Sequence, residues 1–191
     1  MYILILGLVL FLGVHSVRIV ANDWRTATIT RLGEGAWKGL FSLASIAGLA
    51  LMVWGFGQAR QQPVFLWVAP VGMRHLASVL TLLAFILLTA AYVPGNAIKA
   101  KLHHPMVLGV ALWALAHLLA NGNLAHLILF GSFWVWAIFD FRAAKARDRA
   151  NKTAYAAGRI AATAMTVVLG ILAWALFAFW AHGLLIGVRP I

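Results

Sequence analysis

The chain has 191 residues, of which 64% are apolar and 10% charged, and its mean hydropathy is +0.94. A soluble domain is about 45–50% apolar and about 25% charged, so these values exclude both a soluble globular protein and a disordered chain. Its 15 lysines and arginines outnumber four acids, giving a net charge of +11, and it has no cysteine. Disulfides, thiolate metal sites and cysteine nucleophiles are therefore excluded.

Six apolar runs follow one another along the chain, each close to the length of about 20 residues that a transmembrane helix needs. They cover residues 2–20, 35–57, 73–93, 105–120, 124–141 and 161–185. No basic segment precedes the first run and no small-residue cleavage site follows it, so we expect a retained span and not a signal peptide. The sequence predicts an all-α, polytopic transmembrane bundle of about six spans, forming one domain over residues 1–191.

Two of the connections between the predicted spans contain residues that predict their local structure. Asn121-Gly122-Asn123 separates the fourth run from the fifth, which predicts a tight turn and an antiparallel helical hairpin. Residues 58–71 contain two prolines, which prevent a further full span. We expect this segment to lie at the outer interface, with Trp67 as an aromatic anchor.

The basic residues are distributed unevenly between the two sides of the predicted bundle. The loops after the first, third and fifth runs hold Arg18, Arg25, Arg31, Lys38, Lys99, Lys101, Arg142, Lys145, Arg147, Arg149, Lys152 and Arg159, against Arg60, Arg74 and Arg189 on the other side. The positive-inside rule places the basic loops in the cytoplasm and both termini outside. Residues 142–159 are rich in Ala, Lys and Arg and are expected to continue as a basic helix along the inner surface. Because these charges flank membrane spans, we expect contact with anionic lipid and no nucleic-acid partner.

Two histidines lie within predicted spans, where an ionisable side chain indicates function because burying it in lipid is costly. His15 lies towards the inner end of the first run, and His117 lies deep in the fourth. The alternative role for both is a hydrogen bond between helices. His103 and His104 precede Pro105, as at the start of a helix. The remaining histidines are expected near outer span ends, where they need no special role: His75, His126 and His182.

Haem is the cofactor that these residues fit best. Neutral imidazole ligates iron, copper, zinc or nickel, but no carboxylate lies within a span except Asp140 at an edge, and no histidines are spaced i, i+3 or i, i+4 as membrane di-iron sites require. A haem needs one or two histidines, an apolar pocket and cations for its propionates. Arg18 lies three residues after His15, on the same helix face, where it can meet a propionate.

The depths of the two histidines leave alternatives open. With a rise of about 1.5 Å per residue, upright helices would place His15 and His117 about 10 Å apart in depth. Either the helices tilt so that both histidines bind one iron, or two clusters form. The inner cluster would join His15 to His103 and His104, and the outer one would join His117 to another outer histidine.

At these same residues the chain resembles the NnrU family of multi-pass membrane proteins, over nearly its whole length. The stretches that carry the resemblance are Leu12-Gly13-Val14-His15-Ser16 with Arg18, then His104-Pro105-Met106, Gly109, Trp113, Ala116-His117 and Asn121-Gly122. The resemblance implies a protein of the bacterial inner membrane associated with denitrification, in particular with nitrite and nitric oxide reductase activity. It also implies a membrane redox or reductase partner.

The plant branch of the family is zeta-carotene isomerase, which binds haem b through two histidines. Its Val-His-Ser and Ala-His stretches match His15 and His117, so the resemblance implies that these two residues are the haem ligands. Here His103 stands where the plant motif has Arg before His-Pro, a departure that weakens transfer of the isomerase activity. We therefore expect a haem b protein, with carotenoid cis–trans isomerisation as an alternative activity.

His104-Pro105 followed by Gly109 also resembles part of the Arg-His-Pro motif of membrane methyltransferases such as isoprenylcysteine carboxyl methyltransferase. In those enzymes the motif helps to hold S-adenosylmethionine, which makes His104 a candidate cofactor-binding residue. They also need two acidic residues in a later cytoplasmic segment, where this chain has only Asp148. The hypotheses carried forward are a haem redox protein, a haem-dependent isomerase, a methyltransferase and a non-enzymatic assembly factor for a reductase.

Overall fold

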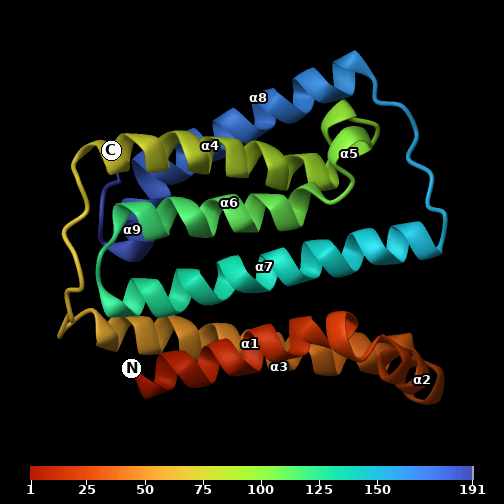
Figure 1. Ribbon diagram of the computed structural model, residues 1–191, viewed down its shortest axis with the longest axis horizontal. Helices are drawn as coiled ribbons and strands as arrows, with labels where there is room; N and C mark the ends of the chain where they lie inside the picture. Colours follow the sequence, from red (N-terminus) through yellow and green to blue (C-terminus); the bar gives the residue numbers. More distant parts are fainter. Residues whose placement is uncertain (191) are drawn as a thin grey trace.

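The computed structural model describes residues 1–190, which are helical over most of their length, with the long helices running side by side (Figure 1). The helices are α1 (Tyr2–Val20), α2 (Asn22–Leu32), α3 (Glu34–Ala59), α4 (Gly72–Tyr92), α5 (Ala97–Leu102), α6 (Pro105–Ala120), α7 (Leu124–Ala150), α8 (Ile160–Leu176), the π-helical turn η1 (Phe177–Ala181) and α9 (His182–Ile186). Within residues 1–190, five helical stretches are long and apolar enough to cross a membrane, and α6 is a shorter apolar helix. The predicted polytopic helical bundle is confirmed.

The helices form two groups that meet at α7 (Figure 1). Helix α1 packs along α3 on one side of α7, while α6 packs against α4 and α7 on the other, with α8 outside α4. The Asn121-Gly122-Asn123 turn joins α6 to α7 as an antiparallel hairpin, as predicted. The two candidate ligand helices, α1 and α6, therefore lie on opposite sides of α7.

Glycines bring α1 and α3 into backbone contact. A Cβ atom on Gly7 would lie 2.5 Å from the amide nitrogen of Met52, and one on Gly48 would lie 2.8 Å from that of Phe11; one on Gly55 would overlap the backbone of Leu4. Small residues allow this approach, and close packing drives helix association in a bilayer, where apolar burial alone does not. The α1–α3 pair is consequently held at a fixed register.

The basic helix predicted over residues 142–159 is correct only as far as Ala150. Residues 142–150 lack Gly and Pro and are rich in Ala, Lys and Arg, so α7 continues without a break beyond its apolar part. After the C-cap Asn151 the chain is non-helical to Arg159, whose amide donates to the carbonyl of Gly95 at 2.8 Å. The helices α2 and α5, which are too polar or too short to span a membrane, are additional to the predicted runs.

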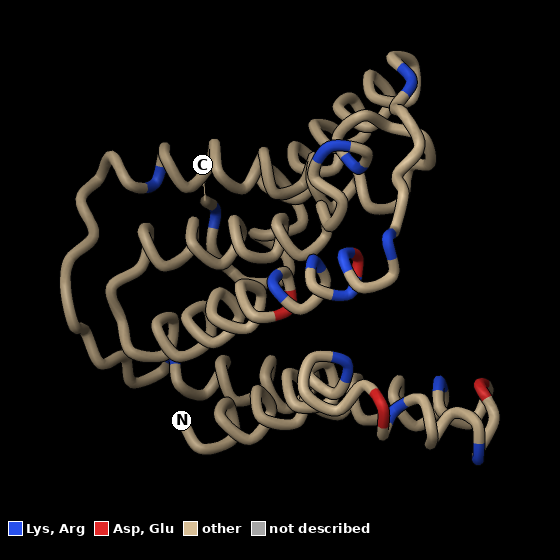
Figure 2. The backbone as a smooth tube through the Cα atoms, turned by 45° about the vertical axis from the view of Figure 1, so that its right-hand side comes forward, with Lys and Arg blue, Asp and Glu red and all other residues tan. Residues whose placement is uncertain are grey.

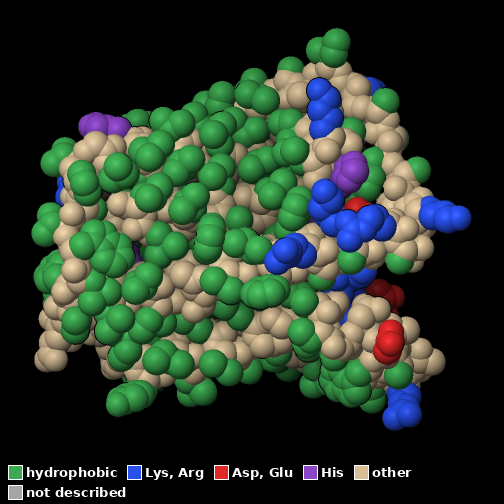
Figure 3. Space-filling model, in the orientation of Figure 1, with side chains coloured by type: hydrophobic (Ala, Val, Ile, Leu, Met, Phe, Trp, Pro, Cys, Tyr) green, Lys and Arg blue, Asp and Glu red, His purple; other side chains and the backbone are tan. Residues whose placement is uncertain are grey.

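The two ends of the bundle differ in charge. Lys and Arg gather at the end formed by α2, α5 and the end of α7, whereas both termini lie at the opposite end (Figures 1 and 2). The space-filling view shows one face of the bundle, and away from the basic end that face is covered mostly by hydrophobic side chains (Figure 3). This arrangement agrees with the predicted orientation, in which the termini are outside and the basic end is cytoplasmic.

The connection between α3 and α4 is an extended segment that crosses the end of the bundle where both termini lie. The amides of Leu66 and Trp67 both donate to the carbonyl of Gly122, at 2.8 and 3.1 Å, and the amide of Leu124 donates to Val64 at 2.9 Å. A side chain on Gly122 would overlap the Trp67 backbone. This segment therefore fastens the α6–α7 turn to the rest of the outer end.

Candidate functional site

His15 lies on α1 in an aromatic environment formed by three helices. Its ring stacks on Phe11 with 4.2 Å between centroids, and it meets the edges of Phe41 at 4.9 Å and Trp136 at 6.2 Å. Its Nδ1 lies 2.6 Å from the carbonyl oxygen of Phe11, one helical turn earlier. Helices α1, α3 and α7 thus all contribute to the position of this imidazole.

His117 lies on α6 in a similar environment. Its ring stacks on Phe130 of α7 with 4.3 Å between centroids, and Trp113 lies 5.2 Å away. Its Nδ1 lies 2.8 Å from the carbonyl oxygen of Trp113, again one turn earlier. In each case an aromatic residue four positions before the histidine supplies both the carbonyl acceptor and a neighbouring ring.

These hydrogen bonds determine the chemistry of both imidazoles. A carbonyl oxygen accepts but does not donate, so each Nδ1 must carry the proton, and in the neutral ring each Nε2 then carries the lone pair. Histidines that bind metals are oriented in the same way, since the nitrogen that does not bind the metal donates to a carbonyl or carboxylate. His15 and His117 are therefore prepared to ligate a metal through Nε2.

The imidazoles of His15 and His117 are not in contact, and a chain of aromatic rings lies between them. Phe133 of α7 lies 5.8 Å from Phe11 and 5.6 Å from Trp113, so it links the aromatic neighbours of the two histidines. His15 faces Trp136 and His117 faces Phe130, six residues apart on α7, which corresponds to an offset of about 9 Å along the helix. This offset agrees with the depth difference expected from the sequence.

Arg18 shares a cavity with His15. This cavity, of about 360 Å³, lies between α1, α2 and α3, and the cations Arg25 and Lys38 also line it. Lys38 is paired with Glu34 at 2.8 Å, which leaves the two arginines as the cations of the cavity that have no carboxylate partner in residues 1–190. The structure thus combines an imidazole, aromatic walls and cationic groups near the C-terminal end of α1.

His104 belongs to a separate cluster at the basic end of the bundle. Its Nε2 lies 2.7 Å from Oδ2 of Asp148, and the Tyr155 hydroxyl donates to the same oxygen at 2.8 Å. His103 stacks on the Tyr155 ring at 4.1 Å. Burial and the hydrogen bond to Asp148 raise the pKa of Tyr155. These contacts fasten residues 151–159 to the start of α6, and they do not include His15.

The outer histidines are arranged differently. His126 tilts against Phe130 at 5.8 Å, so it shares that ring with His117. Its Nδ1 lies 2.6 Å from Oδ1 of Asn123, the residue that caps α7. His182 lies 2.6 Å from the carbonyl oxygen of Val188. Of the two clusters considered from the sequence, the outer one has a structural counterpart in His117 and His126.

Several residues of the site were not identified from the sequence. They are the aromatic neighbours of the two histidines, Phe11, Phe41, Phe130, Phe133 and Trp136. A sequence signal exists for part of this set, because Phe11 and Trp113 each stand four residues before a membrane histidine. No group of three or more His, Asp or Glu side chains within residues 1–190 is arranged to hold a metal ion.

The comparisons with known proteins agree with the resemblance seen in the sequence. The model of one protein family, described as NnrU protein, matches residues 3–190. No curated protein and no solved structure matches the chain.

Proposed function

This chain belongs to the NnrU family, and we propose that it is a membrane haem b protein in which His15 and His117 would ligate haem iron. The observation that supports the proposal best is the hydrogen bond that each histidine makes through Nδ1 to the carbonyl oxygen four residues earlier, at 2.6 and 2.8 Å. In the neutral imidazole this contact leaves Nε2 as the lone-pair donor, which is the nitrogen that a haem iron requires.

The surroundings of the two histidines suit a haem. Aromatic rings from α1, α3, α6 and α7 provide apolar walls for both imidazoles. Arg18 and Arg25 line the cavity of His15 towards the cytoplasmic side, where propionates need cations. We assign Arg18 as a propionate partner and leave His104 in its pair with Asp148, where it serves the structure of the cytoplasmic end.

A bound haem would supply one-electron chemistry. The residues of the chain would hold it: His15 and His117 would supply imidazole ligands, and the surrounding aromatic rings would exclude water. We further propose that this redox protein works in the bacterial inner membrane alongside nitrite and nitric oxide reductase activity, with a membrane redox or reductase partner. This step depends on the NnrU family alone.

Absorption spectra test the haem proposal directly. The protein is expressed with haem supplied and purified in detergent, and spectra are recorded in the oxidised and reduced states. His15→Ala and His117→Ala are measured beside it, with His75→Ala as the control, because His75 is exposed near the outer end of α4. We expect a haem b spectrum that is lost or shifted in both ligand variants and unchanged in His75→Ala.

A colourless wild-type protein would refute the proposal and favour a non-enzymatic assembly factor. A spectrum that is unchanged in either ligand variant would refute the assignment of that histidine.

A further inference from the structure

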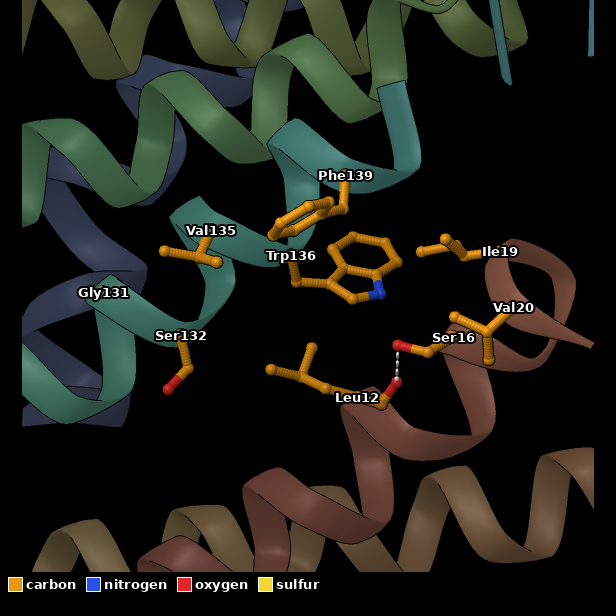
Figure 4. Close-up of a pocket in the computed structure, with 9 residues that line it drawn as sticks. All are labelled: Leu12, Ser16, Ile19, Val20, Gly131, Ser132, Val135, Trp136 and Phe139. Carbon is orange, nitrogen blue, oxygen red and sulfur yellow. Dashed lines mark hydrogen bonds between the residues drawn. The ribbon is translucent and has the colours of Figure 1, made fainter. Parts of the chain in front are cut away.

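The structure keeps His15 and His117 on opposite sides of α7. Helices α1 and α6, which carry these histidines, each pack along α7 (Figure 1). Trp136 projects from α7 towards Ser16 on α1 (Figure 4). Its indole meets the edge of the His15 imidazole with 6.2 Å between ring centroids. Side chains of α7 therefore separate the two imidazoles.

The two histidines are also displaced in opposite directions along the bundle. Phe133 of α7 lies 5.8 Å from Phe11 and 5.6 Å from Trp113 between ring centroids, so these three rings lie at a similar depth. His15 stands one helical turn after Phe11, and His117 stands one turn after Trp113. Helix α1 runs from the end with the termini to the basic end, and α6 runs the other way (Figures 1 and 2). The two turns therefore separate the histidines by about 11 Å in depth.

This separation is larger than one iron can join. Two imidazoles that share a haem iron face each other across the porphyrin. A bond from a histidine nitrogen to a metal is about 2 Å long, so the two ligating nitrogens would lie about 4 Å apart. The contacts of His15 with Trp136 and of His117 with Phe130 give an independent offset of about 9 Å along α7. Both offsets exceed the distance that a shared iron requires.

The cavity beside His15 supplies one axial ligand. Its described lining residues come from α1, α2 and α3, and none of them belongs to α6 or α7. Haem iron is ligated by His, Cys, Met or Tyr side chains, and among the described residues that line this cavity His15 is the one of these types. The cavity also contains Lys38 and Glu34, which pair with each other at 2.8 Å. A haem in this cavity would thus have a single protein ligand.

We infer that no single iron joins His15 to His117, and that the axial position opposite His15 is open to a small diatomic molecule. This inference rests on the proposed haem function and defines the ligand class of the same site. Proteins that hold haem by one histidine, such as globins and peroxidases, bind small molecules at the other axial position. His117 then serves a different iron.

The test measures axial ligation in the full protein, expressed with haem supplied and purified in detergent. Electron paramagnetic resonance of the oxidised protein distinguishes a high-spin haem with one imidazole from a low-spin haem with two. Carbon monoxide added to the reduced protein probes the open axial position. The variants are His15→Gly, His117→Ala and the two combined, and His75→Ala, on the exposed part of α4, is the control. Free imidazole added to His15→Gly replaces the missing ligand, and gel filtration establishes that each variant is folded.

We expect the oxidised wild type to be high-spin and the reduced wild type to bind carbon monoxide. His117→Ala should keep the haem held by His15, with no change in spin state and with carbon monoxide still bound. His15→Gly should lose that haem, and free imidazole should restore it. The combined variant should be colourless, and His75→Ala should match the wild type.

A low-spin wild type that becomes high-spin in both single variants would overturn this inference and leave the haem proposal intact. Complete loss of haem from each folded single variant would do the same. Haem retained in His117→Ala and absent from His15→Gly would support the inference while refuting His117 as a ligand. A colourless wild type would refute the haem proposal and this inference together.

Discussion

His15 and His117 make the same hydrogen bond on two different helices: each Nδ1 contacts the carbonyl oxygen four residues earlier, at 2.6 Å for His15 and 2.8 Å for His117. Here the bond stays within the helix, so it fixes the rotation of the ring and leaves the other nitrogen for a partner from outside. This shared geometry is the one that the proposed haem ligands require, with Nε2 of each ring carrying the lone pair.

Replacing Arg18 separates propionate binding from iron ligation. In Arg18→Gln we expect haem to be retained about tenfold less tightly, as for the loss of one charge-assisted hydrogen bond. The position of the Soret band should not change, because both imidazoles remain. Arg31→Gln is the control, since Arg31 lies on the same side but does not line the cavity of His15. Haem content after gel filtration measures the loss, and a shifted Soret band would contradict this role.

The backbone contact between α1 and α3 predicts that the stability of the protein depends strongly on Gly55. Gly55→Ala places a methyl group against the backbone of Leu4, which cannot move without separating the helices, and we expect a loss of about 1–3 kcal/mol in stability. Gly57→Ala, two residues later on α3, meets nothing within 4 Å and should change stability by less than about 0.5 kcal/mol. Thermal unfolding in detergent compares the two variants; equal effects would show that the seam is not closely packed.

The titration of Tyr155 reports the packing of the loop between α7 and α8. Because burial and the hydrogen bond to Asp148 raise its pKa, the neutral phenol is favoured in the folded state. The associated stabilisation is present below the ordinary tyrosine value of about 10 and is lost as the pH rises through the raised pKa. In a Tyr2→Phe, Tyr92→Phe background Tyr155 is the one tyrosine left of three, and absorbance at alkaline pH follows its titration.

Adding Asp148→Asn to that background should lower the Tyr155 pKa only part of the way, since burial remains. A Tyr155 that titrates at the ordinary value before this change would mean that residues 151–159 are not held against α6.

The absence of cysteine in the chain allows a direct test of orientation. Gln62→Cys lies in the exposed segment at the outer end, and Thr153→Cys lies in the exposed loop after α7. An impermeant maleimide applied to intact cells should label Gln62→Cys and should label Thr153→Cys only after the membrane is broken. The opposite labelling pattern would mean that the bundle has the reverse orientation in the membrane, with Arg18 and Arg25 on the outer side.

The spans were predictable because length and apolarity alone determine them. The first and fourth predicted runs have the same bounds as α1 and α6, and the second and third differ from α3 and α4 by only one or two residues. Bilayer thickness imposes a nearly fixed length on such segments. The composition of residues 142–159 predicted that α7 continues beyond its apolar part. It did not predict the end of the helix at Ala150, because residues that favour helix stand both before and after Asn151.

The candidate site was harder to predict from the sequence than the spans were. His15 and His117 stood out because ionisable residues are rare in spans, and Arg18 followed from helix periodicity. Which histidines approach each other depends on helix rotation and on the position of α7, and neither leaves a trace in the order of residues. The pairing of His104 with Asp148 joins positions 44 residues apart, and Phe133 became visible as the link between two aromatic groups only once α1 and α6 were placed.

The backbone contact between α1 and α3 also limits how the protein can move. Since Gly7, Gly48 and Gly55 leave no space for sliding along this seam, His15, Arg18 and Phe41 travel together as one rigid body. A change in the separation of His15 and His117 must then occur as shear at the α1–α7 boundary. Trp136 of α7 meets the ring of His15 at that boundary, so such a shear would also change the contact between these two rings.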